Sequence, residues 1–237
     1  MIVAPIPVCG RFPLVTHTIK RLKDQGVIVI CIGHEPMGKK IADYMDVEWI
    51  EYSNDLLGSK WNTGFLAAKK YNPEGVLFMG SSDLMSSNYL TESSKYLKEY
   101  DLIGMLGCYF ADLNKSDDNK KNDEIRLVKW NGYGDGDREN EPIGIGRLLS
   151  SRILDEIGWK PFNDELNSSL DFSMWEKVLN SNGKIKILDD NNLKLLSIST
   201  NLWRNKHKFE QHWNNILPSE KIYDKSFFLD FKEIFDI

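Results

Sequence analysis

The stretch LGSKWNTGFLAAKKYNPEGVLFMGSSDLMSSNYL, residues 57–90, decides the fold that this sequence predicts. Its first part has apolar residues at helical spacing, and Pro73 ends that helix. A short apolar run at 76–79 follows and stops at a turn that contains Asp83. The stretch therefore predicts a helix and then a buried strand, with a carboxylate at the strand's carboxyl end, where open α/β sheets bind ligands.

The alternation of strand and helix extends on both sides of this stretch. A near-continuous β-branched run at 27–32 is typical of a parallel strand covered on both faces. Further strands are predicted at 2–8, 47–50 and 102–110, with helices around 15–22 and after Ser86, which is a suitable N-cap. Four such alternations in about 110 residues predict an α/β fold of the doubly wound type, with a mostly parallel central sheet flanked by helices.

The second half of the chain has a different pattern. Residues 112–124 contain no apolar residue after Leu113 and predict a solvated loop. Strands are then predicted at 125–130, 184–188 and 193–198, and helices at 149–157 and 170–179. The sequence thus predicts an α/β half at 1–110, a second half of the same domain with a smaller antiparallel element at 111–200, and an aromatic, helical tail at 201–237.

Composition excludes several classes of protein. A net charge of −5 argues against a broad basic surface for nucleic acid. The apolar runs are too short to span a bilayer, and the N-terminus lacks the basic region of a signal peptide. The three cysteines, Cys9, Cys31 and Cys108, are widely spaced and form neither a disulfide framework nor a metal motif. We expect a cytoplasmic protein without a membrane span.

Asp83 is the first candidate for chemistry. After a buried strand, its carboxylate is suited to a magnesium or manganese ion that bridges a diphosphate, or to a ribose hydroxyl. The alternative is structural, because Gly-Ser-Ser-Asp also forms a good turn. Lys60 and Asn62 lie near the start of the preceding helix, where a phosphate can bind. Their alternatives are a solvated lysine and a capping amide.

Asp171 is the candidate catalytic residue. It lies where the polar loop 163–169 gives way to an amphipathic helix, so it is placed to accept a proton from a hydroxyl. Alternatively it complements the helix dipole, and Asp164 and Glu165 compete for the role of base.

Two glycines and two histidines complete the set. Gly144 and Gly146 allow the backbone to approach a ligand closely, or they form a simple turn. His207 is a candidate metal ligand or phosphate contact, with packing as the alternative. His34 follows the second strand and is placed to face a nucleotide, unless it is an ordinary loop residue.

Together these segments resemble the family 2 glycosyltransferases of the GT-A fold over roughly residues 1–190. Residues 5–14 look like the strand and turn that cradle the nucleotide base, with Pro5 and with Arg11 at the family's frequent Arg. Residues 58–64, GSKWNTG, are similar to Gly-x-x-Arg-Asn-x-Gly, with Asn62 at the Asn and Trp61 at the Arg.

The resemblance continues at three later segments. Residues 76–83 fall on the strand that ends in the Asp-x-Asp metal motif, and 142–159 look like the glycine-rich acceptor segment. Leu170 and Asp171 fall on the Glu-Asp pair, whose Asp is commonly the base. The chain departs from the family in three places. At least one metal-motif carboxylate is missing at 80–83, Leu170 replaces the Glu, and the second strand ends in CIGH.

The resemblance implies an inverting glycosyltransferase that takes a nucleotide-diphosphate sugar. Ser82 and Asp83, with or without a manganese or magnesium ion, would hold the diphosphate, and Asp171 would deprotonate the acceptor. If the metal is absent, Lys60 or His207 would compensate for its charge. The acceptor stays open between a glycan, a protein, a lipid carrier and a modified nucleobase. One alternative is a nucleotidyltransferase, although residues 8–13 carry only Arg11 where that class has a basic loop; another is a silent sugar-nucleotide-binding module. The interpretation requires Asp83 and Asp171 to converge on one cleft.

Overall fold

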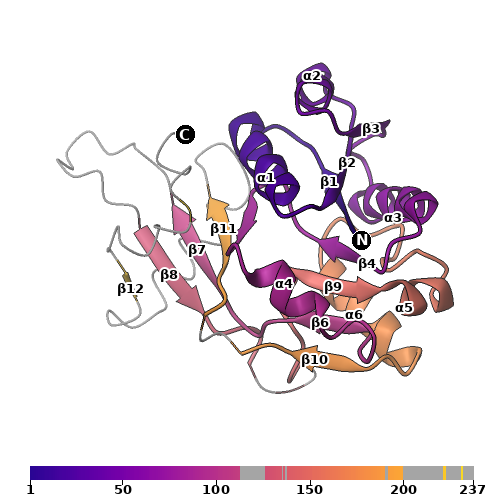
Figure 1. Ribbon diagram of the computed structural model, residues 1–237, viewed down its shortest axis with the longest axis vertical. Coiled ribbons are helices and arrows are strands. Elements are labelled where there is room, and N and C mark those ends of the chain that lie inside the picture. Colours follow the sequence, from indigo (N-terminus) through magenta and orange to yellow (C-terminus); the bar gives the residue numbers. More distant parts are fainter. Residues whose placement is uncertain are drawn as a thin grey trace.

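A computed structural model describes residues 1–112, 126–134, 136, 138–189, 192–199, 221–222 and 231. Its main element is a seven-stranded sheet with the order β10-β6-β9-β4-β1-β2-β3 (Figure 1). Strand β9 is antiparallel to its neighbours β4 and β6, and the other neighbouring pairs are parallel. The predicted mostly parallel central sheet is therefore confirmed. Its strands are β1 (Ile2–Pro7), β2 (Ile28–Gly33), β3 (Glu48–Glu51), β4 (Gly75–Phe78), β6 (Leu102–Gly104), β9 (Arg147–Ser150) and β10 (Ile185–Ile187).

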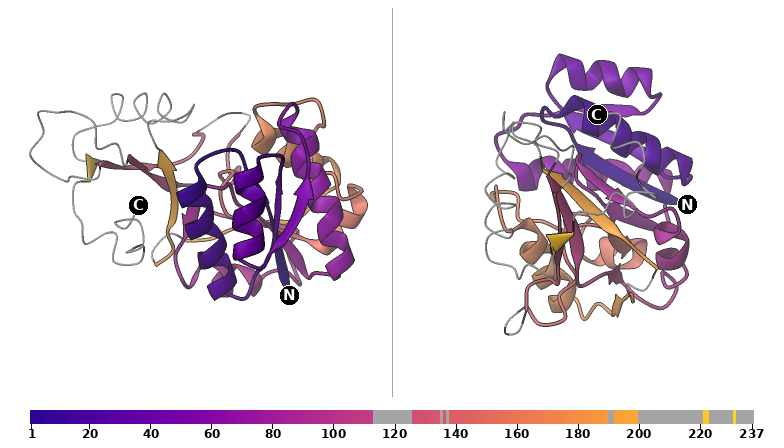
Figure 2. Two further views of the ribbon diagram at one scale, coloured as in Figure 1. Left: turned by 90° about the horizontal axis from the view of Figure 1, so that it is seen from above. Right: turned by 90° about the vertical axis from the view of Figure 1, so that its left-hand side faces the viewer.

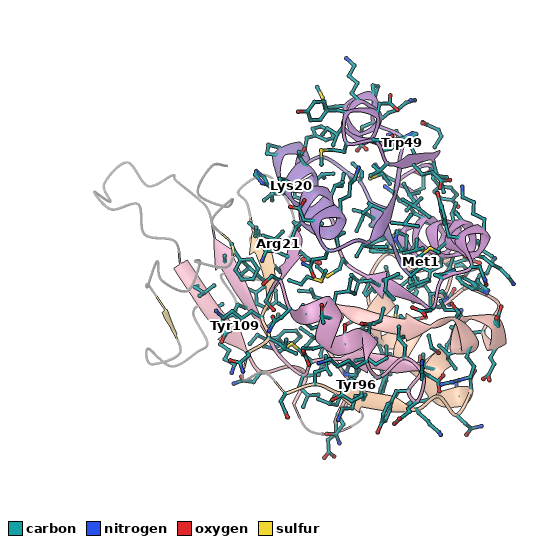
Figure 3. All side chains as sticks on the ribbon, in the orientation of Figure 1. Met1, Lys20, Arg21, Trp49, Tyr96 and Tyr109 are labelled. Atoms are coloured by element: carbon teal, nitrogen blue, oxygen red, sulfur yellow. The ribbon has the colours of Figure 1, made fainter. Side chains whose placement is uncertain are left out.

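A second, smaller sheet lies beside the first and has the order β12-β8-β7-β11-β5. It is mixed, because β7 and β11 are parallel whereas its other pairs are antiparallel. Figure 1 shows β8, β7 and β11 on the side of the molecule away from α3, and Figure 3 shows Arg21 of α1 facing this sheet, where its Nε donates to the carbonyl of Met85 at 2.7 Å. The strands are β5 (Asp83–Met85), β7 (Cys108–Asp112), β8 (Arg126–Trp130), β11 (Leu195–Ser199) and β12 (Lys221–Ile222).

Helices cover both faces of the seven-stranded sheet (Figure 2). One apolar core packs α1 and α4 against the sheet through Val15, Ile19 and Leu90. The other packs α3, α5 and α6 through Phe65, Ile153 and Met174. These two cores explain why the central strands are apolar throughout. The helices are α1 (Phe12–Asp24), α2 (Pro36–Tyr44), α3 (Leu57–Ala68), the 3-10 turn η1 (Lys69–Tyr71), α4 (Tyr89–Ser94), α5 (Ser151–Glu156) and α6 (Leu170–Asn180).

The strand order reverses between β1 and β4. Strand β1 pairs with β2 from Val3 to Pro7, but with β4 only at Ile2 and Val3. Pro5 and Pro7 have no backbone N–H to donate, which limits the ladder of β1. Open α/β sheets bind ligands outside the carboxyl ends of their strands at such a reversal, so β1 and β4 mark the place to search for a site.

Two predicted elements are wrong. The single strand at 102–110 is two strands, β6 and β7, which belong to different sheets. The chain crosses between the sheets at Met105–Gly107, where Gly107 packs against the carbonyl of Trp130. The predicted helix at 149–157 begins only at Ser151, because the fully buried Leu148 and Leu149 belong to β9. Ser150 caps that helix through its Oγ, which accepts from the N–H of Ile153.

Several predictions concern residues that lie outside the described ranges. The predicted loop at 112–124, except for Asp112, lies outside the described residues. So do His207 and the predicted helical tail at 201–237, apart from residues 221–222 and 231. Within the part of the chain that the structure describes, no helix is both long and apolar enough to cross a membrane.

Candidate functional site

The candidate site lies at the carboxyl edge of the seven-stranded sheet. Strands β1, β2 and β4 all end at this edge because they are parallel. Helix α3, which returns the chain to the start of β4, begins here, and so does α6, which leads into the parallel strand β10. The antiparallel strand β9 enters at the same edge, with Arg147 opposite Phe78. Segments far apart in sequence thereby meet beyond β1 and β4.

The turn after β1 carries a free positive charge. Gly10 and Arg11 both adopt left-handed backbone conformations, with φ of 62° and 51°, and α1 begins directly after them. The half-buried Arg11 donates from Nη1 to Ser82 Oγ at 2.8 Å. Among the described residues, Arg11 forms no ion pair with a carboxylate. The predicted ligand-binding residues Arg11 and Ser82 are thus in direct contact.

Lys60 holds the turn after β1 by a hydrogen bond to its backbone. Its buried ammonium donates to the carbonyl of Val8 at 2.6 Å and to the side chain of Asn54. Burial lowers the pKa of Lys60, which the nearby Cys9 and Glu35 partly offset. The predicted phosphate contact is therefore a buried cation that fixes the turn between β1 and α1 and adds to its positive potential.

Glu35 is a polar group that the sequence analysis missed. It follows β2 and accepts from Asn54 Nδ2 through Oε1 at 3.1 Å. Its Oε2 is buried and has no hydrogen-bond partner among the described residues. A buried carboxylate oxygen without a partner is costly, so Oε2 is available to accept a hydrogen bond. The available signal was an acid two residues beyond the second strand; His34, the predicted contact beside it, is exposed.

Asp83 lies within a strand rather than in the turn that the sequence predicted. It is buried in β5, where Oδ1 accepts from Ser197 Oγ at 2.7 Å and Oδ2 accepts from the N–H of Gly80 at 2.8 Å. Burial raises the pKa of Asp83, although these two hydrogen bonds and the charge of Arg11 oppose that rise. Both carboxylate oxygens are therefore engaged by the protein.

These residues do not fit a divalent cation. Metal sites need several oxygen ligands with free lone pairs that converge on one point. Asp83 has both oxygens in hydrogen bonds, and its neighbour Ser82 contacts the guanidinium of Arg11. No group of three or more metal-ligating acidic, histidine or cysteine side chains occurs in the described ranges. The predicted ligand His207 lies outside those ranges, so manganese or magnesium binding stays a prediction.

Asp171 stands at the start of α6 in a polar network. Its Oδ2 accepts from the hydroxyl of Tyr133 and from Arg138 Nη2, the latter at 3.0 Å. Burial alone would raise the pKa of Asp171, but the Tyr133 hydrogen bond and the charges of Arg147 and Arg138 lower it. No partner of Oδ1 occurs among the residues placed by the structure. An ionised carboxylate is therefore held by one oxygen, with the other left for a hydroxyl.

Arg147 and Glu141 form the buried base of this network. Both side chains are fully buried and pair at 2.6 Å between Nη2 and Oε1. Arg147 also donates to the backbone carbonyl of Asp171 at 2.5 Å, which fixes the first turn of α6. Arg138 completes the network by pairing with Glu141 and stacking 3.3 Å above the ring of Tyr133. The negative charges of the two carboxylates in this network are thus balanced by the positive charges of its two guanidinium groups.

The two glycines of the predicted acceptor segment have different surroundings. A Cβ at Gly144 would lie 3.3 Å from Asp171 Cβ and 3.6 Å from the ring of Phe78, so Gly144 places Asp171 beside the end of β4. Gly146 has a φ of 77° and packs against Leu195, and its carbonyl accepts from Tyr89 at 2.7 Å. Its conformation and packing explain this glycine without a ligand.

Two other predicted residues are engaged within the protein. Pro5 is buried in β1 beneath Gly64 of α3, where an added Cβ would lie 2.6 Å from Pro5 Cβ. Asn62 is buried, and its amide bonds both the N–H and the carbonyl of Phe162 and the side chain of Asp164. Asp164, the rival base, is thus tied to α3. These contacts join α3 to the sheet and to the 162–164 segment.

Asp83 and Asp171 are thus both close to the same edge of the sheet, because Asp83 follows β4, which ends there, and Asp171 is in the first turn of α6, which begins there. Asp83 comes five residues after Phe78 along the chain, and Asp171 packs against Gly144, which lies beside the ring of Phe78. Arg11 and Lys60 are on the Asp83 side of this arrangement. The arrangement presents positive charge at the end of β1 and an ionised carboxylate near the end of β4.

The two carboxylates should give opposite pH dependences of stability. The raised pKa of Asp83 means that its protonated form favours folding, so its contribution is fully present below the unfolded value of about 4 and is lost as pH rises through the folded value. The lowered pKa of Asp171 means that its contribution is present above about pH 4 and is lost as pH falls further.

Urea unfolding of Asp83→Asn and Asp171→Asn beside the unmodified protein tests this expectation. The free-energy cost of Asp83→Asn should grow as the buffer is taken from about pH 7 to about pH 4, whereas the cost of Asp171→Asn should shrink below about pH 4. Parallel changes in the two variants would contradict the assignment.

Of three comparisons with known proteins, the one with solved structures finds similar chains. No protein-family model matches the chain, and no curated protein matches it. Among solved structures, the chain is similar to 4-diphosphocytidyl-2C-methyl-D-erythritol synthase from Anaerococcus prevotii DSM 20548, with 14% identity and a TM-score of 0.53 over 91% of this chain and 96% of that one. It is also similar to HddC from Yersinia pseudotuberculosis, with 18% identity and a TM-score of 0.49 over 83% and 93% of the two chains. The first similarity shows a shared α/β fold with a mostly parallel central sheet flanked by helices.

Proposed function

We propose that this chain is a transferase whose substrate carries a nucleoside diphosphate, bound at the carboxyl ends of β1 and β4. The diphosphate would lie at the turn that carries Arg11, above the buried ammonium of Lys60. Glu35, with its unsatisfied Oε2, stands at the end of β2 and suits a ribose hydroxyl or a base N–H. The fold supports this position, because its strand order reverses there.

The transfer that the site supports best is glycosyl transfer. The observation that carries it is Asp171, which is fixed through Oδ2 and has Oδ1 unoccupied by other described residues. In this reaction the acceptor hydroxyl gives its proton to Asp171 as its oxygen bonds the anomeric carbon. The bond from that carbon to the diphosphate breaks, and its electron pair leaves with the nucleoside diphosphate. Direct displacement inverts the anomeric centre.

Nucleotidyl transfer is the second candidate, and the structural comparison favours it. The name of the Anaerococcus enzyme describes formation of a diphosphocytidyl compound. The left-handed pair Gly10 and Arg11 also places an unpaired guanidinium directly after β1. In that reaction a phosphate oxygen of the second substrate attacks the α-phosphorus of a nucleoside triphosphate, and the bond to pyrophosphate breaks. Asp171 would then position the second substrate rather than act as a base.

The released product separates these functions. The protein would be incubated with UDP-, GDP-, CMP- and TDP-sugars, and separately with nucleoside triphosphates and sugar 1-phosphates, each with and without manganese. Glycosyl transfer releases a nucleoside diphosphate or monophosphate from an activated sugar, including slow hydrolysis without acceptor, whereas nucleotidyl transfer releases pyrophosphate. We expect the nucleoside diphosphate. Release of pyrophosphate would contradict glycosyl transfer and support nucleotidyl transfer. Binding of an activated sugar without any product would indicate a silent sugar-nucleotide-binding module.

A further inference from the structure

We propose that Arg11 takes the place of the divalent cation at this site, so that the nucleoside diphosphate binds without a metal. The inference rests on the proposed function and names how the same site recognises its ligand. It starts from the contact between Arg11 Nη1 and Ser82 Oγ at 2.8 Å. Ser82 and Asp83 are the positions at which the sequence predicts a metal-bound diphosphate, and a permanent guanidinium charge already lies there.

The oxygens of Asp83 are committed to folding. Oδ1 accepts from Ser197 of β11, and Oδ2 accepts from the N–H of Gly80, so the carboxylate joins β5 to its neighbour and closes the turn after β4. Thr18 of α1 ties the same turn by donating to the carbonyls of Ser81 and Asp83 at 3.3 and 3.2 Å. A cation at Asp83 would have to share buried oxygens that already accept these hydrogen bonds.

The positive charge beside this turn is unpaired. Within the described ranges Arg11 has one side-chain hydrogen bond, which leaves its other guanidinium donors for an anion. Lys60 donates to a neutral carbonyl and a neutral amide, so no carboxylate in those ranges cancels its charge by a direct ion pair. Two cations thus flank the single turn 8–11, and their positive charges favour a diphosphate that would otherwise need a metal.

Isothermal titration calorimetry with UDP, GDP, CDP and TDP as probes tests the inference. For the diphosphate that binds, we expect dissociation constants in chelator and in manganese to agree within about threefold. Arg11→Asn should weaken binding by about tenfold to a hundredfold in chelator, the usual effect of losing a charge-assisted hydrogen bond. Asn suits this position because it tolerates the left-handed backbone of residue 11. Arg11→Lys, which keeps a point charge without the fork, should lie between the two.

The matched control is Lys39→Gln, which removes one positive charge from the exposed face of α2. It should leave the affinity unchanged, and thermal unfolding of every variant without nucleotide checks that the fold is kept. Binding that needs manganese, or an Arg11→Asn variant with the affinity of the unmodified protein, would overturn the inference while the proposed function stands. If none of the four diphosphates binds under either condition, the inference and the proposed function both fail.

Discussion

Asp171→Asn is expected to lower the turnover rate of sugar transfer by about a thousandfold, within the range that general acid–base catalysis contributes. The amide keeps the size of the side chain and an oxygen for Tyr133 and Arg138, but it cannot accept the proton of the acceptor hydroxyl. The dissociation constant of the nucleoside diphosphate should change by less than about threefold, because the diphosphate lies at Arg11. Initial rates and calorimetry on the same preparation measure both quantities.

The matched control for this variant is Asp164→Asn. Asp164 is the rival base, but it is bonded to Asn62 and pairs with Lys160 at the surface. Its replacement should leave the turnover rate within about twofold of the unmodified protein if Asp171 is the base. A fully active Asp171→Asn enzyme would remove Asp171 from the mechanism and favour nucleotidyl transfer.

Arg147→Met is expected to lower the free energy of unfolding by about 3–5 kcal/mol, since it removes the fully buried one of the two guanidinium groups that pair with Glu141. Arg147 is fully buried and is the partner of the fully buried Glu141. It also donates to the carbonyls of Pro142, Ile143 and Asp171, which lose those bonds in the variant. Urea unfolding followed by tryptophan fluorescence measures the change.

Lys160→Met is the control for this loss of charge. Its ion pair with Asp164 is about half exposed, so the free energy of unfolding should fall by less than about 1 kcal/mol. The double variant Arg147→Met with Glu141→Leu should recover part of the lost stability, because no buried charge is then left without its main partner. Similar costs for Arg147→Met and Lys160→Met would show that the buried network contributes little to folding.

Much of the fold could be predicted from the sequence, because the spacing of apolar residues within each segment indicates its secondary structure. The β-branched run before Gly33 and the helical spacing before Pro73 each report the burial of one element, and both gave elements close to those observed. The two wrong elements, the single strand at 102–110 and the helix that was predicted from 149, lie where apolar spacing alone does not fix the type of element or its ends. Leu148 and Leu149 are buried because β9 lies between β4 and β6, a pairing across some seventy residues that no local period records.

Less of the site could be predicted, because its residues are held by partners that are far away in the sequence. Asp171 was found because it starts a helix after a polar loop, which is a local signal. The ion pairs that hold it come from Arg138, Glu141 and Arg147, and the sequence alone does not show that these charges meet in the interior. The burial of Asp83 depends likewise on Ser197, more than a hundred residues away. Glu35 directly follows the CIGH segment that ends the second strand, and the sequence does not show that its carboxylate is partly buried.

The place of β9 in the sheet has a consequence for how the chain is made. Strand β4 has β1 on one side, but on the other side it waits for residues 147–150, which leave the ribosome about seventy residues after it. Until then the nascent sheet ends in an open apolar strand, Gly75–Phe78, of the kind that other chains can pair with. A fragment that stops at residue 112 should therefore aggregate, whereas one that continues past β10 closes this edge with its own sequence.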